Sequence, residues 1–227
     1  MPKLAKKCIA SWKKYCPEYE IIEWNEANFD IKSNQYAFEA YHNKKYAFVT
    51  DYVRLHILYK YGGIYMDTDV EVFKPLDSFL FHEAFSGFEL PEHIPTGIMA
   101  SIKGFGLFGE FLEYYKGKSF IKKDGSLDLT SNVTIITSIM EKYGLKKNGK
   151  YQVIKGFALY PREYFCPLDD ATGIINKTEN TVTIHWFNKS WIDQKMILRS
   201  KLTRPFHRIF GVDCFKWLKD LIEPGTK

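Results

Sequence analysis

The sequence predicts a single α/β domain followed by a helical C-terminal extension. The chain has 227 residues, 45% of them hydrophobic and 26% charged, so one domain with a substantial core fits its length. Segments with apolar residues at helical spacing alternate with short apolar runs typical of strands, the pattern of an α/β fold. No repeat, low-complexity tract or linker divides the chain. We therefore expect a domain over residues 1–198 and an extension over residues 199–227.

The individual elements follow from hydrophobic periodicity and from glycine and proline. Helices are expected at residues 3–16, 34–43, 47–60, 107–116, 131–143 and 205–222. Strands are expected at residues 19–24, 64–66, 84–88, 97–102, 151–154 and 181–185. Pro17 ends the first helix. Gly62-Gly63 ends the third, because glycine adopts a left-handed backbone without a Cβ clash.

Charge and cysteine content restrict the class of protein. Lys and Arg exceed Asp and Glu by 32 − 27 = 5, a modest positive field that favours anionic small molecules, anionic lipid or nucleic acid. No block of five or six like charges occurs, so we expect no nucleic-acid partner. The cysteines form no Cys-x-x-Cys pair, which indicates free thiols in a reducing compartment. The sequence shows neither an apolar signal core nor a run of about 18 apolar residues, so we expect a cytoplasmic protein.

Two carboxylates follow the short apolar run at residues 64–66. Asp67 and Asp69 are one residue apart, and on an extended backbone their side chains would point to the same side. Like charges at this spacing repel, so a site that keeps both ionised usually supplies a cation. Oxygen ligands favour magnesium, manganese or calcium. The alternative is a pair of solvated aspartates in a turn, because an isolated Asp-x-Asp is common.

A second charged pair lies on the predicted helix at 47–60. Asp51 and Arg54 are three residues apart, so they share one face of that helix. They could form an exposed intrahelical salt bridge, which would contribute little. Their neighbours are apolar, however, and the helix leads directly to the two aspartates. The spacing is compatible both with a salt bridge and with a functional site.

Two segments taken together resemble a known signature: Thr50-Asp51-Tyr52-Val53-Arg54, and then Leu58-Tyr59-Lys60-Tyr61-Gly62-Gly63-Ile64-Tyr65-Met66-Asp67-Thr68-Asp69-Val70. They resemble the glycosyltransferase family with the Asp-x-Asp sugar-binding motif, of the glycosyltransferase family 32 type. That family includes initiating mannosyltransferases of the yeast type and bacterial capsule glycosyltransferases, and the glucosylating clostridial toxins are distant relatives. The similarity is close over residues 47–73 and looser over residues 3–30 and around Trp191.

The resemblance implies a GT-A-type fold with a Rossmann-like nucleotide-binding half. It also implies transfer of a hexosyl unit, with retention, from a nucleoside-diphosphate sugar, most simply a UDP-sugar. The acceptor would be a hydroxyl of a glycan or a lipid-linked glycan in surface or capsular polysaccharide synthesis. Mn²⁺ or Mg²⁺ would be the cofactor, because a divalent metal beside a diphosphate neutralises the leaving group.

The resemblance also implies roles for particular residues. Asp51 and Arg54 would bind the donor sugar's hydroxyls, and Tyr65 would lie against the nucleoside. Asp67 would contact ribose and sugar, and Asp69 would bind the metal. These two aspartates, with Asp51 and Arg54, form the expected catalytic set.

The segment at residues 185–191 resembles the His…Ser-Trp element that closes the site in this family. His185 and Ser190 are candidates to complete the metal or diphosphate shell, and Trp191 is a candidate to cover the donor. We therefore expect Asp67, Asp69 and His185 as metal ligands. The alternative is that the tryptophans of this segment are core aromatics at the end of the sheet.

The chain departs from the family pattern at its start. Family members usually open with a strand that forms part of the nucleoside pocket, whereas this chain begins at the helix that follows it. A degenerate, non-catalytic nucleotide-sugar-binding scaffold is therefore the alternative function. A metal-dependent phosphohydrolase is a further rival, but it should carry additional Asp or His ligands near strand ends.

The extension combines basic and apolar residues at helical spacing. We expect its apolar face to pack on the catalytic domain. The alternative is a basic amphipathic helix, over residues 199–222, that contacts an anionic membrane surface at the inner face of the membrane. Gly211 interrupts the predicted helix at a cost of about 1 kcal/mol relative to alanine.

Overall fold

The structure is a computed structural model that describes residues 1–90, 92–188 and 194–215. The helices are α1 (Lys3–Tyr15), α2 (Gln35–His42), α3 (Tyr46–Tyr61), α4 (Gly106–Glu113), α5 (Asn132–Glu141), α6 (Arg162–Phe165) and α7 (Gln194–Phe210). The strands are β1 (Gly63–Met66), β2 (Val70–Val72), β3 (Ala84–Gly87), β4 (Ile98–Ser101), β5 (Gln152–Ile154), β6 (Phe157–Tyr160) and β7 (Thr183–His185). Groups of helices and groups of strands follow one another along the chain, so the protein has the expected α/β class.

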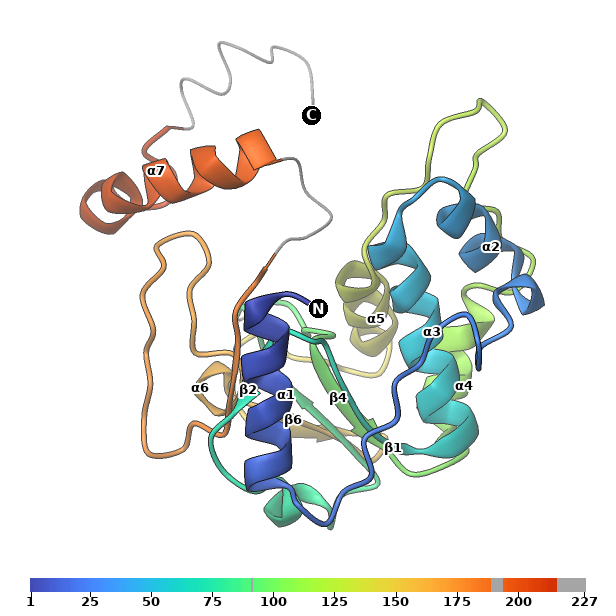
Figure 1. Ribbon diagram of the computed structural model, residues 1–227, viewed down its shortest axis with the longest axis horizontal. Helices are drawn as coiled ribbons and strands as arrows, with labels where there is room; N and C mark the ends of the chain where they lie inside the picture. Colours follow the sequence, from blue (N-terminus) through green and yellow to red (C-terminus); the bar gives the residue numbers. More distant parts are fainter. Residues whose placement is uncertain (91, 189–193, 216–227) are drawn as a thin grey trace.

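The strands form two sheets (Figure 1). The larger has the order β1-β4-β3-β6-β5, in which β3 and β6 are parallel and the other neighbours are antiparallel. The smaller pairs β2 with β7 in antiparallel register. A mixed sheet flanked by helices agrees with the α/β class. It is compatible with the GT-A fold, which stays a prediction.

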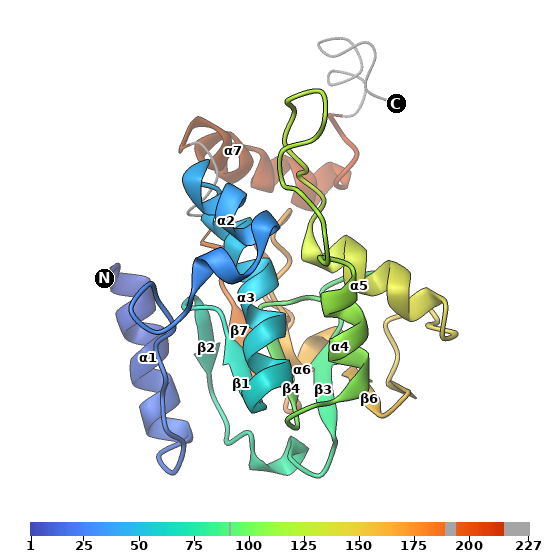
Figure 2. The same cartoon turned by 90° about the vertical axis from the view of Figure 1, so that its right-hand side faces the viewer.

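Helix α3 is the central helix of the larger hydrophobic core (Figure 2). It contacts α2, α4, α5 and β1, and Phe48, Leu55 and Leu58 are buried in these contacts. The helix ends at Gly62, which has a φ of 75°. A Cβ on Gly62 would lie 2.7 Å from the amide nitrogen of Lys103, so the turn into β1 requires glycine.

Helix α1 supports the smaller sheet. The indole of Trp12 donates a hydrogen bond of 2.7 Å to the carbonyl oxygen of Val70, and the hydroxyl of Ser11 accepts one of 2.9 Å from the amide of Val72. These bonds hold β2 by its backbone. The prediction of a helix at residues 3–16 is therefore confirmed, and that helix positions the strand that follows Asp69.

One strand prediction was wrong, and strands β2 and β6 were not predicted. Residues 19–24 form no strand, and Ile21 and Ile22 are 41% and 54% exposed, because no neighbouring strand pairs with them. Strand β6 was missed, although it is buried between β3 and β5. The hairpin between β5 and β6 turns at Lys155 and Gly156, both of which have positive φ. This turn pairs the two short strands in antiparallel register.

The C-terminal helix also differs from its prediction. It covers residues 194–210 and ends where Gly211 adopts a φ of 82°, so this glycine terminates the helix that it was expected to interrupt. The expected helical residues 216–222 lie outside the described residues. Within the described part of the helix, the expected packing of its apolar face on the domain is wrong, because Phe206, Ile209 and Phe210 are exposed. The domain boundary at residues 198 and 199 stays a prediction.

The cysteines agree with their prediction. All four are free thiols, of which Cys8, Cys16 and Cys166 are buried and Cys214 is half-buried. Among the helices that the structure describes, none is both long and apolar enough to cross a membrane.

Candidate active site

The two motif aspartates lie in a tight turn between the two sheets. Strand β1 ends at Met66 and β2 begins at Val70, whose amide donates a hydrogen bond of 2.9 Å to the carbonyl oxygen of Asp67. The amide of Asp67 donates to the carbonyl of Gly97 at 2.8 Å. The expectation that an extended backbone aligns the two carboxylates was wrong. A turn, held by these two backbone hydrogen bonds, brings the two carboxylates close together instead.

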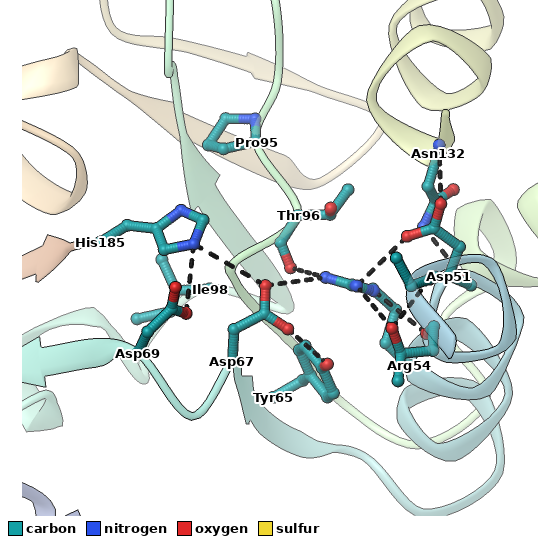
Figure 3. A network of polar contacts seen from close by, with 12 residues as sticks. Asp51, Arg54, Tyr65, Asp67, Asp69, Pro95, Thr96, Ile98, Asn132 and His185 are labelled. Carbon is teal, nitrogen blue, oxygen red and sulfur yellow. Dashed lines mark hydrogen bonds and ion pairs between the residues drawn. The ribbon is translucent and has the colours of Figure 1, made fainter. Parts of the chain in front are cut away.

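His185 completes a cluster of three metal-ligating side chains. The pairing of β2 with β7 sets Val70 opposite His185. The imidazole Nε2 consequently lies 3.3 Å from a carboxylate oxygen of Asp69 and 4.0 Å from one of Asp67 (Figure 3). One ligand atom from each of the three residues falls within 4.8 Å of the other two. The amide of Asn188 donates to the second oxygen of Asp69 at 2.7 Å.

The electrostatics of this cluster keep Asp69 ionised. Burial acts to raise the pKa of Asp69, but its contact with His185 and the amide of Asn188 outweigh burial and lower it. Burial likewise acts to lower the pKa of His185. Its contact with Asp69, the neighbouring Cys166 and the charge of the aspartates together hold that pKa well above its ordinary value. The cluster therefore favours a positive charge beside its carboxylates.

On the other side of Asp67, Arg54 is buried and fully paired (Figure 3). Its NH1 group donates to the carbonyl oxygen of Thr96 and to Asp67, the latter at 3.4 Å. Its Nε and NH2 groups contact Thr50, and NH2 also lies 3.2 Å from Asp51. All five N–H groups of the guanidinium thus have partners. The alternative of an exposed intrahelical salt bridge is wrong, because Arg54 is only 4% exposed.

Asp51 is held from two directions. Besides Arg54, its carboxylate accepts a hydrogen bond of 3.1 Å from the amide of Asn132, the first residue of α5. The side-chain amide of Asn132 donates to the backbone oxygen of Asp51 at 3.1 Å. Burial raises the pKa of Asp51, and Arg54 and this amide oppose the shift. The charge of Asp51 therefore depends on the arginine beside it.

Tyr65 contacts the motif directly. Its hydroxyl donates a hydrogen bond of 2.6 Å to the oxygen of Asp67 that Arg54 does not contact. The guanidinium of Arg54 lies 4.7 Å from the centre of its ring. Tyr65 and Arg54 therefore orient Asp67 through both of its oxygens. The expected position of Tyr65 against a nucleoside stays a prediction.

Of the predicted site residues, the structure brings together Asp51, Arg54, Tyr65, Asp67, Asp69 and His185. Ser190 and Trp191 lie outside the described residues. Several contributors were not predicted: Thr50, Thr96, Gly97, Asn132 and Asn188. Most of these act through backbone atoms, which a residue pattern does not indicate. Asn132 had a usable signal, because Ser131 begins a helix and a helix N-terminus can accept a carboxylate.

The donor set fits a divalent cation. Two carboxylate oxygens and one imidazole nitrogen suit manganese, which accepts both, better than magnesium, which prefers oxygen. Within the part of the chain that the structure describes, this is the one group of three or more such residues. The further ligands expected of a phosphohydrolase are not found there. The sequence also has an adjacent pair of aspartates, Asp169 and Asp170, which could serve such an enzyme. Asp169 instead forms an ion pair with Arg162, and Asp170 forms one with Arg204.

Comparisons with known proteins agree with this site. Residues 2–86 match the family described as a glycosyltransferase sugar-binding region containing a DXD motif. Inositol phosphoceramide mannosyltransferase 3 of Schizosaccharomyces pombe is 33% identical over 92 residues, which cover 39% of this chain and 26% of that relative. The match thus spans about a quarter of the relative's length. Both findings support a glycosyltransferase family, whose motif corresponds to Asp67-Thr68-Asp69.

Proposed function

We propose that the protein is a metal-dependent glycosyltransferase that moves a hexosyl unit from a UDP-sugar to a hydroxyl of a glycan or glycolipid acceptor. One observation carries the proposal. One ligand atom each from Asp67, Asp69 and His185 lies within 4.8 Å of the other two. The buried guanidinium of Arg54 forms an ion pair with Asp67. The region that matches a sugar-binding family includes Asp67, Asp69 and Arg54, whereas His185 comes from a distant strand.

The residues have distinct tasks in this proposal. Asp67, Asp69 and His185 would hold Mn²⁺ or Mg²⁺, which would offset the negative charge on a departing diphosphate. Asp67 would also offer an oriented carboxylate to donor hydroxyls, because Arg54 and Tyr65 fix both of its oxygens. Arg54 and Asp51 would act on the donor sugar mainly by keeping this arrangement rigid. Positioning and electrostatics would therefore supply most of the rate enhancement.

The acceptor and the reaction's stereochemistry belong to the same proposal. The yeast relative is named for transfer of a mannosyl unit to inositol phosphoceramide, which supports a lipid-linked acceptor here. We propose retention at the anomeric carbon and a role in surface or capsular polysaccharide synthesis, on the basis of the family signature. We also propose that Ser190 and Trp191 take part in closing the donor site.

A thermal-shift series tests the proposal. UDP, GDP and several UDP- and GDP-sugars are added with and without Mn²⁺, and turnover of each donor is measured in parallel. A ligand that binds only the folded protein raises its melting temperature. We expect a nucleotide-dependent rise that requires Mn²⁺ and is absent in Asp69→Asn. Asp124→Asn is the matched control, because it makes the same change in an exposed loop.

The outcomes separate the candidate functions. Stabilisation by nucleotide with donor turnover supports the transferase. Stabilisation without turnover of any donor, in the presence of candidate acceptors, would favour the non-catalytic scaffold. A melting temperature indifferent to every nucleotide, with and without Mn²⁺, would overturn the proposal.

A further inference from the structure

Helix α7 carries an apolar stripe that faces away from the domain. We use the name α7 stripe for Leu198, Leu202, Phe206 and Ile209. Their spacing of four, four and three residues sets them on one face of the helix. They are 59%, 65%, 49% and 73% exposed, respectively. Exposed apolar patches, especially those rimmed by polar residues, mark protein or membrane interaction sites.

Charged contacts, and not the stripe, attach α7 to the domain. The guanidinium of Arg204 lies 3.2 Å from both the backbone oxygen and the carboxylate of Asp170. Arg208 donates a hydrogen bond of 2.7 Å to the backbone oxygen of Thr172. Arg204 is two residues from both Leu202 and Phe206, about 200° around the helix, so it lies on the opposite face. The attachment through arginines therefore directs the stripe outward.

The charge around the stripe selects the kind of partner. Residues 194–210 contain no Asp or Glu, and they include three Arg and two Lys. Arg199 and Lys201 are exposed beside the stripe. A second copy of the helix would bring the same positive charges together, which opposes self-association through this face. An anionic lipid surface instead offers an apolar interior for the stripe and negative headgroups for the basic residues.

The position of α7 relates this surface to the active site. Strand β1 leads to Asp67, and β7 ends at His185. Figures 1 and 2 both place α7 beyond these ends of the two strands. A surface that contacts α7 would consequently face the end of the molecule that carries the metal-ligating cluster. A lipid-linked acceptor in that surface would therefore lie at the same end of the molecule as the metal-ligating cluster.

We propose that α7 attaches the protein peripherally to an anionic membrane surface. The stripe enters the boundary between headgroups and acyl chains, and Arg199 and Lys201 contact anionic headgroups. Such attachment is reversible and weakens with salt, because exposed charges are screened beyond about 10 Å at 0.1 M salt. That the membrane presents the acceptor rests on the proposed function. Membrane attachment itself requires neither donor nor metal.

Vesicle co-sedimentation tests the proposal. The full chain is mixed with phosphatidylcholine vesicles, or with vesicles of phosphatidylcholine and phosphatidylglycerol, at low and high salt. We expect binding to the anionic vesicles that falls at least tenfold at high salt, and little binding to the neutral ones. Leu202→Gln with Ile209→Gln should reduce binding about tenfold. Leu129→Gln, at a residue that is 58% exposed elsewhere, is the matched control.

A second pair of variants tests the charge. Arg199→Gln with Lys201→Gln should weaken binding and flatten its salt dependence, whereas Lys122→Gln with Lys123→Gln, in an exposed loop, should change neither. Melting temperatures should stay at the wild-type value, because all these side chains are exposed. Binding indifferent to lipid charge, or unchanged in the stripe variant, would overturn the proposal. A dimer in sedimentation velocity that the stripe variant abolishes would assign the stripe to self-association and also overturn it.

The proposed function can fail separately from this inference. Asp69→Asn should bind anionic vesicles as the wild type does, because it alters only the metal-ligating cluster. The stripe variant should keep the Mn²⁺-dependent thermal shift with nucleotide. If the wild-type chain fails to bind anionic vesicles but keeps its nucleotide response, attachment through α7 is refuted and the transferase proposal still stands.

Discussion

The two sides of Asp67 differ in what they offer a ligand. On the Arg54 side, every guanidinium N–H has a protein partner, and Arg54 and Asp51 are 4% and 9% exposed. On the His185 side, the side chains of Asp67 and Asp69 are 26% and 16% exposed, and their oxygens face an imidazole. One side is a closed charge network, and the other is a set of ligand atoms within reach of solvent.

The difference indicates a division of labour within one site. A buried ion pair is costly to assemble and costly to break, so it fixes geometry. Ligand atoms held in partial contact with solvent can exchange one cation for another without disturbing that network. Removing a group from the Arg54 side should therefore mainly lower the free energy of unfolding. Removing one from the His185 side should mainly weaken the response to metal and nucleotide.

The largest effect is expected from Arg54→Ala. It leaves Asp51 buried without its cation, which should cost about 3–5 kcal/mol of unfolding free energy. Urea denaturation measures the loss. Arg54→Lys should be intermediate, because one ammonium cannot replace five donors in a fork. A loss of under about 1 kcal/mol in Arg54→Ala would contradict the description of this side as structural.

Asp69→Asn should act on the other side alone. We expect turnover to fall about a hundredfold or more, as for loss of a group that stabilises developing charge. The loss of stability should be smaller than that in Arg54→Ala, because the amide fills the same space and ends the repulsion from Asp67, although it gives up the contact with His185. Donor turnover in Mn²⁺ and urea denaturation, measured together, check both expectations. Turnover close to that of Asp124→Asn would remove Asp69 from the metal site.

Gly97→Ala should loosen the metal-ligating cluster through a neighbour. A Cβ at this position would lie 2.8 Å from Nδ1 of His185, so the imidazole must move. We expect the Mn²⁺ concentration needed for half-maximal response to rise about tenfold, with a stability loss of about 1–3 kcal/mol from overpacking. Gly106→Ala is the control, because its Cβ meets nothing within 4 Å. An unchanged Mn²⁺ response would show that the imidazole's position does not matter.

The smallest effect is expected from Tyr65→Phe. It removes one hydrogen bond to Asp67, worth about 1 kcal/mol. Burial raises the pKa of Tyr65 well above its ordinary value, so the hydroxyl remains a donor and the loss should be independent of pH between 6 and 9, a range that lies below the ordinary tyrosine pKa of about 10. Urea denaturation across that range measures it, with exposed Tyr61→Phe for comparison. A loss that disappears towards high pH would mean that the hydroxyl ionises.

Local features were predictable from local sequence. The periodicity of residues 3–16, the start of a helix at Ser131 and the glycines after α3 each depend on neighbours along the chain. The nearness of Asp51, Arg54 and the two aspartates was indicated in part, because a helix followed by a tight glycine turn returns the chain to the same region. These predictions needed only backbone preferences that act over a few residues.

Other features required the folded chain. Residues 19–24 have strand composition but no partner strand, whereas Phe157–Tyr160 has partners on both sides. His185 reaches the aspartates only because β7 pairs with β2, more than a hundred residues earlier. The direction of the α7 stripe depends on the arginine contacts with a distant loop.

The sequence by itself determined the α/β class, most helices and the identity of the chemical groups, because periodicity and residue type are local properties. Tertiary structure alone decided which carboxylates pair with Arg54, which remain open to a cation and which face of α7 meets solvent. The physical reason is that burial and charge pairing depend on distances between segments, and these distances are set when strands find partners and helices pack.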